Sequence, residues 1–156
     1  MKFNINQNDL QQSLGYCQGV IEKRSTLPIL SNILLDATGS NLKIIATDLD
    51  LIFINEIQNI EIIEEGKTTT VSSTLYDIIR KFNSGKKINF NQTSENKIQL
   101  ESEKSIFNLN CLSASEFPVT EENFTSNGFM MKSKELLKLL NKCKFSISND
   151  ETRHYL

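Results

Sequence analysis

This chain of 156 residues contains few of the residues that mark turns, linkers and disulfides: it has three cysteines, six glycines and two prolines, and it has no tryptophan. So little glycine and proline excludes a linker or low-complexity protein. Cys17, Cys111 and Cys143 fit neither a disulfide framework nor the spacing of a zinc site. Uncharged runs fall short of the roughly 18 apolar residues of a membrane-spanning helix, and the first residues form no secretion signal. We therefore expect reduced thiols and a cytoplasmic protein without a membrane span.

Charge of one sign is also lacking. The chain has 17 Lys and Arg against 19 Asp and Glu, a net charge of −2. Residues 1–128 carry a net charge of −5, and residues 129–156 carry +3. A weakly acidic body argues against tight nucleic-acid binding, yet it allows a loose contact with a DNA backbone on one surface.

Short alternating runs rich in Ile and Thr dominate the chain and predict strands. The expected strands are 2–6, 29–35, 42–47, 51–57, 60–63, 68–71, 88–91, 98–101 and 106–112. Apolar residues at helical spacing predict helices over 8–22, 74–82 and 133–145. Ser72 or Ser73 and Ser133 are the expected N-caps of the second and third helices. These elements predict an α+β fold with helices packed on antiparallel sheets.

The order strand, helix, strands recurs, and the third unit aligns with the first at an offset of 126 residues. Phe3, Leu10 and Leu14 then meet Phe129, Leu136 and Leu140. The same offset also pairs identical residues at 17/143, 21/147, 26/152 and 30/156. The alternative is two unrelated amphipathic helices, each behind a strand. A true repeat predicts a first domain over 1–126 and, over 127–156, the opening strand and helix of a second domain, so that the chain reads as a fragment.

Several motifs resemble one known family. They are 24–35 (RSTLPILSNILL), 46–50 (ATDLD), 77–80 (DIIR), 107–109 (FNL), 116–118 (EFP) and 153–156 (RHYL). With the strand-helix opening, they are similar to the bacterial DNA polymerase III beta subunit, the replicative sliding clamp, at nearly constant spacing over the whole chain.

The resemblance implies the DNA-clamp fold, in which each domain repeats a strand-helix-strands unit twice. It also implies a three-domain protomer that pairs head to tail into a ring around duplex DNA, with helices lining the hole and sheets outside. Such a clamp is a non-catalytic processivity factor without a cofactor. Its partners would be double-stranded DNA, a second protomer, the polymerase catalytic subunit and the clamp loader.

The resemblance assigns DNA contacts to Arg24, Arg80, Lys138, Arg153 and Tyr155. Lys134, Lys138 and Lys142 also form a basic stripe on the third helix. The alternative for the cations is an ordinary solvated helix end or face. Because a few flexible cations attract phosphate without reading sequence, they would let a ring slide.

The resemblance also implies contacts with other proteins. Ile78, Phe107 and Leu109 match positions that meet the partner protomer, with plain core packing as the alternative. Arg153 and Leu156 are the part of the partner-peptide cleft that this chain holds, and a fragment ending there should neither bind partners through that cleft nor close a ring.

Three other patterns carry little weight. The sequence 66–68 (GKT) matches the end of a phosphate-binding loop, but residue 61 is Glu and acidic residues precede the motif. Asp48 and Asp50 could ligate a metal, although a turn is favoured because no further ligands accompany them. A thiol nucleophile formed by Cys17 or Cys143 with His154 is disfavoured because both cysteines lie on expected buried helix faces.

The rival function is a β-rich protein-interaction domain with no DNA role.

Overall fold

The computed structural model describes residues 1–21, 27–118 and 129–147. The chain divides into two units, Met1–Val119 and Thr120–Leu156. The domain boundary expected at residue 126 lies outside the described residues.

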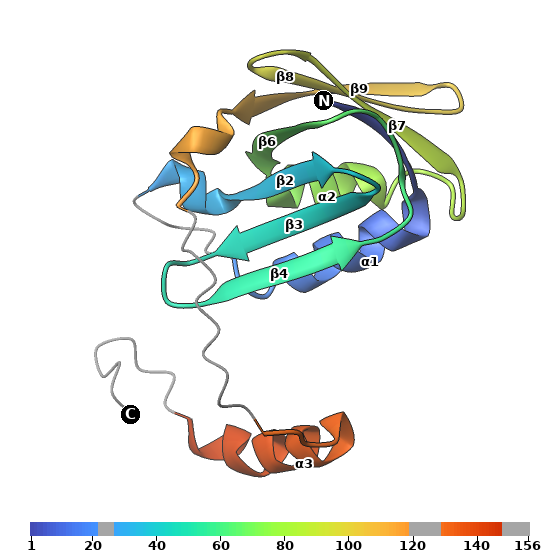
Figure 1. The fold of residues 1–156 in the computed structure, drawn as a ribbon. Coiled ribbons are helices and arrows are strands. Elements are labelled where there is room, and N and C mark those ends of the chain that lie inside the picture. The colour runs from blue at the N-terminus through green and yellow to red at the C-terminus, as the bar shows by residue number, and fades with distance from the viewer. Residues whose placement is uncertain (22–26, 119–128, 148–156) are drawn as a thin grey trace. The chain divides into compact units, whose positions relative to one another are not determined.

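The first unit contains a nine-stranded antiparallel sheet in the order β4-β3-β2-β6-β9-β8-β7-β1-β5 (Figure 1). Its strands in chain order are β1 (Lys2–Asn6), β2 (Asn32–Thr38), β3 (Asn41–Thr47), β4 (Ile52–Ile57), β5 (Glu61–Glu64), β6 (Gly66–Val71), β7 (Lys87–Ser94), β8 (Lys97–Ser102) and β9 (Ser105–Leu112). Two helices, α1 (Gln7–Cys17) and α2 (Ser72–Ile79), lie on one face of this sheet. This arrangement confirms the α+β expectation.

The topology contains the same motif twice. β1-α1-β2-β3-β4 is followed by β6-α2-β7-β8-β9, with β5 leading into β6. The opening strand of each half joins the sheet of the other half: β1 pairs with β7, and β6 pairs with β2. The half-sheet β4-β3-β2-β6 joins the half-sheet β9-β8-β7-β1 where β6 pairs with β9 through two residue pairs, Thr69 with Leu112 and Thr70 with Cys111. The halves are therefore interlocked chiefly by exchanged strands.

The core lies between the helix pair and the inner face of both half-sheets. Leu10, Leu14 and Cys17 of α1 meet Leu75 and Ile79 of α2 in this core. The strands add residues that include Phe3, Ile33, Leu35, Leu42, Ile44, Ile88, Phe90, Ile98 and Leu100. The rings of Phe3 and Phe90 stack with centroids 4.5 Å apart, which packs β1 against the second half. The predicted apolar faces of α1 and α2 are thus confirmed, except for Ile78, which is only half-buried.

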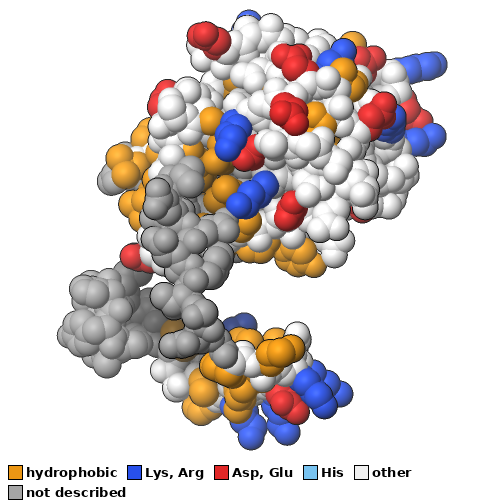
Figure 2. All heavy atoms as spheres, viewed as in Figure 1, with side chains coloured by type: hydrophobic (Ala, Val, Ile, Leu, Met, Phe, Trp, Pro, Cys, Tyr) orange, Lys and Arg blue, Asp and Glu red, His pale blue; other side chains and the backbone are white. Residues whose placement is uncertain are grey.

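The opposite face of the sheet carries charges of both signs. On neighbouring strands Lys67, Asp36, Lys43 and Glu56 lie opposite one another in a row, and the Lys67 ammonium is 2.8 Å from the Asp36 carboxylate. Figure 2 shows basic and acidic side chains interspersed over this face of the first unit. Such a mixture forms no extended basic field.

Helix α3 (Ser133–Cys143), followed by a 3₁₀ turn (Lys144–Ser146), is the element described in the second unit. Its bounds coincide with those of α1 shifted by 126 residues, the offset of the sequence repeat. Leu136, Leu140 and Cys143, whose counterparts in α1 are buried, are exposed. The expected opening strand is not formed over residues 129–132, because a strand without a pairing partner leaves its backbone groups unsatisfied.

Several sequence predictions about element ends are wrong. The second helix, for example, spans Ser72–Ile79 rather than 74–82, and the strand expected over 88–91 spans Lys87–Ser94. The first helix ends at Cys17, not at residue 22, because the chain turns at Gln18 and Gly19. Residues 29–31 belong to a 3₁₀ turn begun by Pro28, so β2 starts at Asn32. The N-caps of α2 and α3 are Val71 and Lys132, without a side-chain bond, so the expected serine caps do not form.

Because β1 pairs with β7, a substitution in β1 should also destabilise the half-sheet β7–β9. Phe3→Ala should lower the free energy of unfolding by about 3–5 kcal/mol, because it removes a fully buried ring and leaves a cavity. Urea titration measures this cost, and hydrogen exchange should show faster opening of β7–β9 as well as of α1. Ile63→Ala, at a side chain 54% exposed, is the control and should change stability by less than about 0.5 kcal/mol. Loss of protection confined to β1 and α1 would contradict the interlock.

Candidate nucleic-acid interface

The two helices of the first unit form an antiparallel pair that is tied at both ends. At one end the buried amide Nε2 of Gln7 donates to the Ile79 carbonyl at 2.9 Å. At the other end the Gln18 Nε2 donates to the Ser72 hydroxyl at 2.8 Å. Loss of the buried bond would lower the free energy of unfolding, because the Ile79 carbonyl would then be left without that partner. The end of α2 is therefore held in place on α1.

The outward surface of this helix pair is polar but almost free of charge. Within Gln7–Cys17 and Ser72–Ile79 the charged residues are Asp9 and Asp77. Amide, hydroxyl and phenol groups line the groove between the helices: Asn8, Gln11, Gln12, Tyr16, Tyr76 and Ser84, with Gly15. Such groups can exchange hydrogen bonds with water or with a DNA backbone, but they supply no long-range attraction.

Arg80 is the cation at the end of this layer. It directly follows α2 as its C-cap, where the negative end of the helix dipole favours a positive charge. Its side chain is 55% exposed, and its Nη1 lies 3.7 Å from an Asp77 carboxylate oxygen. The guanidinium carbon also lies 5.4 Å from the centre of the Tyr76 ring. The structure thus leaves Arg80 able to reach a phosphate.

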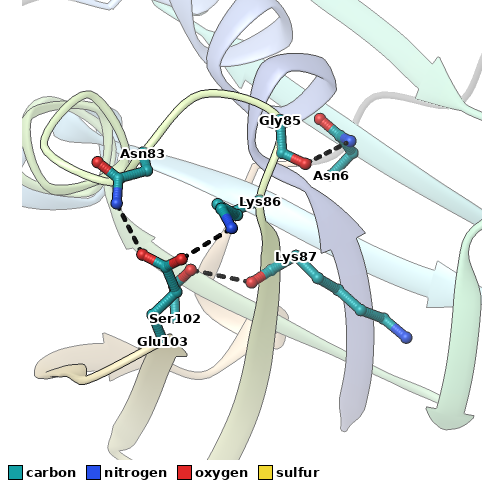
Figure 3. A network of polar contacts seen from close by, with 7 residues as sticks. All are labelled: Asn6, Asn83, Gly85, Lys86, Lys87, Ser102 and Glu103. Carbon is teal, nitrogen blue, oxygen red and sulfur yellow. Dashed lines mark hydrogen bonds and ion pairs between the residues drawn. The ribbon is translucent and has the colours of Figure 1, made fainter.

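Lys86 and Lys87, the next basic residues along the chain after Lys81, are both ion-paired. The Lys86 ammonium lies 2.9 Å from Glu103, which also accepts a bond from the Asn83 amide at 2.7 Å (Figure 3). Lys87 pairs with Glu61. These contacts hold the pKa of both carboxyls below the ordinary value, chiefly through the lysine hydrogen bonds. At neutral pH both lysines are therefore largely compensated.

The three apolar residues assigned to a protomer contact have different surroundings. Leu109 is only 9% exposed and belongs to the core, so it offers almost no surface to a partner and the core-packing alternative fits it better. Ile78 and Phe107 are half-buried against that core. Phe107 packs edge-on against Phe82, with ring centroids 5.6 Å apart. Ile78 and Phe107 retain part of their surface.

Known proteins share this architecture. The sequence model of the family described as DNA polymerase III beta subunit, N-terminal domain, matches residues 1–121. The chain belongs to the DNA polymerase III beta-subunit family. A protein named beta sliding clamp from Caulobacter vibrioides is 39% identical over 158 residues, and one from Pseudomonas putida is 31% identical over 156; each match covers 100% of this chain and 42% of the relative. The chain thus spans less than half the length of these relatives.

Solved structures agree with the family assignment. The Caulobacter crescentus pol III beta structure matches with a TM-score of 0.91 and 39% identity, over 100% of this chain and 42% of that one. A Bartonella birtlesii sliding clamp matches with a TM-score of 0.92 and 34% identity, over 99% and 41%. The clamp fold inferred from the sequence motifs is therefore confirmed.

The family resemblance predicts further DNA-contacting residues, and the structure describes only some of them. Arg24, Arg153 and Tyr155 lie outside the described residues, as does Leu156 of the partner-peptide cleft. Lys138 is described on α3, where it is exposed between Lys134 and Lys142. The DNA-contact roles of all these residues stay predictions.

The structure also describes the three patterns that could have indicated other chemistry: residues 66–68, the aspartates at 48 and 50, and the cysteines. Residues 66–68 lie in strand β6 and are followed by more strand, so they form no loop around a phosphate. The turn expected at 48–50 is confirmed, with one Asp48 carboxylate oxygen accepting from the backbone N–H groups of Asp50 and Leu51. Cys17 is buried, and burial raises the pKa of its thiol to about 12, so it is a poor nucleophile. The buried position predicted for Cys143 is wrong, since that residue is exposed in this chain.

Within residues 1–21, 27–118 and 129–147, three or more His, Cys, Asp or Glu side chains nowhere gather as a metal site would require. Over the same residues, the helices are too short and too polar to cross a membrane.

Sequence reasoning missed the neighbours of Arg80. Asp77 and Tyr76 precede Arg80 by three and four residues, a spacing that places side chains side by side on a helix. That signal was present in the sequence and identifies both residues. The pairing of Lys86 and Lys87 had no such signal, because Glu103 and Glu61 reach them through the sheet.

The two paired carboxyls predict part of the acid sensitivity of the fold. Their pKa values are lower in the folded protein than the ordinary 4.5. Ionised Glu61 and Glu103 therefore stabilise the fold above about pH 4.5, and this stabilisation is lost as the pH falls through their folded pKa values. Urea unfolding between pH 3 and 7 should show a shallower acid decline for Glu61→Gln with Glu103→Gln than for the unmodified chain.

Glu101→Gln with Glu116→Gln is the matched control. Both are exposed glutamates without an ion pair among the described residues, and the control removes the same charge. An acid decline equally shallow in the control would contradict a role for the lysine pairs.

Proposed function

We propose that this chain is part of a sliding clamp, a ring that encircles duplex DNA and tethers the replicative polymerase. The observation that carries the proposal is the family match over residues 1–121, in which a helix pair backed by a sheet is the first domain. Its function is topological, because a closed ring cannot leave DNA sideways. It needs no catalytic residue or cofactor and acts in the bacterial cytoplasm on any DNA sequence.

The domain division predicted from the sequence is part of this proposal. The first domain covers 1–126, and 127–156 opens the second. The coincidence of α3 with α1 at the repeat offset supports this division, as does the end of the family match at residue 121. The exposed apolar face of α3 would be covered by strands of a complete second domain.

The charge distribution suits a sliding contact. A protein that must move along DNA needs attraction to phosphate that is weak and independent of sequence. The mainly uncharged polar surface of α1 and α2, with Arg80 at its end, fits this need. We propose that Arg24, Arg80, Lys138, Arg153 and Tyr155 contact the DNA backbone.

Strand β9 supports pairing with a second protomer. On one side it pairs with β8 over its length, whereas β6 covers only its last two residues on the other. Residues 105–109 therefore present an open edge among the described strands, and such an edge can accept a strand of another chain. We propose that Ile78 and Phe107 lie at this protomer contact and that Leu109 supports it from the core.

The polymerase catalytic subunit and the clamp loader would bind through the cleft to which Arg153 and Leu156 contribute.

A protein-interaction domain with no DNA role is the second candidate. The net charge of −5 over residues 1–128 and the open edge of β9 favour it. The two candidates differ in what the cations of the helix layer do.

Retention on DNA at low salt separates these candidates. The chain should be held by immobilised duplex DNA at about 20 mM salt, and Arg24→Ala with Arg80→Ala should abolish retention. Lys97→Ala with Lys104→Ala removes the same charge from the β8–β9 hairpin and should retain most binding. Equal losses in both variants, or no DNA retention at all, would favour the interaction domain.

A further inference from the structure

Three side chains meet at the end of helix α2. The Arg80 guanidinium carbon lies 5.4 Å from the centre of the Tyr76 ring, and its Nη1 lies 3.7 Å from Asp77 Oδ1. An aromatic face attracts a cation, and arginine in particular can lie flat on a ring. The guanidinium of Arg80 therefore has two neighbours, an aromatic ring that can orient it and a carboxylate that can pair with it.

Tyr76 is a fixed platform for this arginine. Its ring is half-buried and packs against the core, and it reaches across to α1, where a Cβ atom placed on Gly15 would meet the Tyr76 hydroxyl at 3.7 Å. The buried bond from Gln7 to the Ile79 carbonyl holds the adjacent turn of α2. The ring can thus restrain the guanidinium at low entropic cost.

Asp77 is, by contrast, a solvated anion. Its side chain is 71% exposed, so its pair with Arg80 is screened by water and weak. A weak internal pair can be displaced by a phosphate, but the phosphate must compete with the carboxylate for the same guanidinium. Asp77 also places a negative charge on the surface that would face a DNA backbone.

We propose that Tyr76 and Asp77 are positioning residues for Arg80: the Tyr76 ring holds the guanidinium at the end of α2, and the Asp77 carboxylate competes with phosphate for it. Each DNA contact of Arg80 is then short-lived, as a sliding surface requires. This inference rests on the proposed function, in which Arg80 contacts the DNA backbone.

The test is a titration of the chain with a 12-base-pair duplex at low salt. Fluorescence anisotropy of the labelled duplex measures the affinity of every variant, and the NMR signal of the Arg80 Nε–H group reports how the guanidinium is restrained where Arg80 is present. Asp77→Asn should raise the affinity about two- to five-fold, the range expected for removal of a weak exposed competitor. Asp9→Asn is the matched control, because it removes the same charge from an exposed carboxylate of α1 and should give a smaller gain.

A double variant separates a local effect from general repulsion. In an Arg80→Gln background, Asp77→Asn should give no more gain than Asp9→Asn, because the competition has lost its target. Tyr76→Leu should weaken binding about two-fold and broaden or shift the Arg80 Nε–H signal of the free chain, whereas Tyr76→Phe should keep both. Thermal unfolding identifies any variant that is not folded, and Asp77→Asn, at an exposed site, provides the test if Tyr76→Leu fails to fold.

The outcomes distinguish this inference from the function on which it rests. If Arg80→Gln leaves DNA affinity and its salt dependence unchanged, the proposed DNA contact of Arg80 is wrong. If Arg80→Gln weakens binding while Asp77→Asn behaves like Asp9→Asn in both backgrounds, the positioning roles are wrong and the DNA contact stands.

Discussion

The exchange of opening strands between the two halves is the constraint on which the rest of the structure depends. β1 completes the sheet of β7–β9, and β6 completes the sheet of β2–β4. Each helix follows directly on an exchanged strand, so the exchange also brings α1 and α2 together as an antiparallel pair over one core. The position of Arg80 at the end of α2 is thus a consequence of how the halves interlock.

This architecture limits the basic charge at the helix layer. The surface of α1 and α2 is formed mainly by amides and hydroxyls, and Lys86 and Lys87 are held by Glu103 and Glu61. Arg80 and the exposed Lys81 that follows it remain at the end of α2. Attraction between exposed charges falls off over about 10 Å at 0.1 M salt. A DNA backbone near the helix pair would therefore meet a local pair of cations rather than a broad basic field. That is the electrostatic pattern of a surface that keeps DNA near without holding it at one site.

Much of the fold could be predicted from the sequence, because burial and periodicity are local signals. The alternating runs predicted the strands, and the repeat offset of 126 found in the sequence recurs in the observed bounds of α1 and α3. Pairing partners are not local, so the order of the strands and the ion pairs of Lys86 and Lys87 could not be read from the pattern. Leu109 shows the same limit: alternation on β9 marked it as apolar, but only the packed structure shows that it faces the core.

The family motifs carried the functional prediction further than the chemistry of single residues could. An arginine after a helix is usually a solvated end. Arg80 gains significance from the helix surface beside it, which carries no other cation within α1 and α2, and from the family to which the chain belongs. The central claim is topological and is tested most directly with the complete gene product that contains this chain. Loaded by its clamp loader onto nicked circular DNA, it should stay bound in about 0.5 M salt and be released when the circle is cut. Equal release from intact and cut circles would contradict the account.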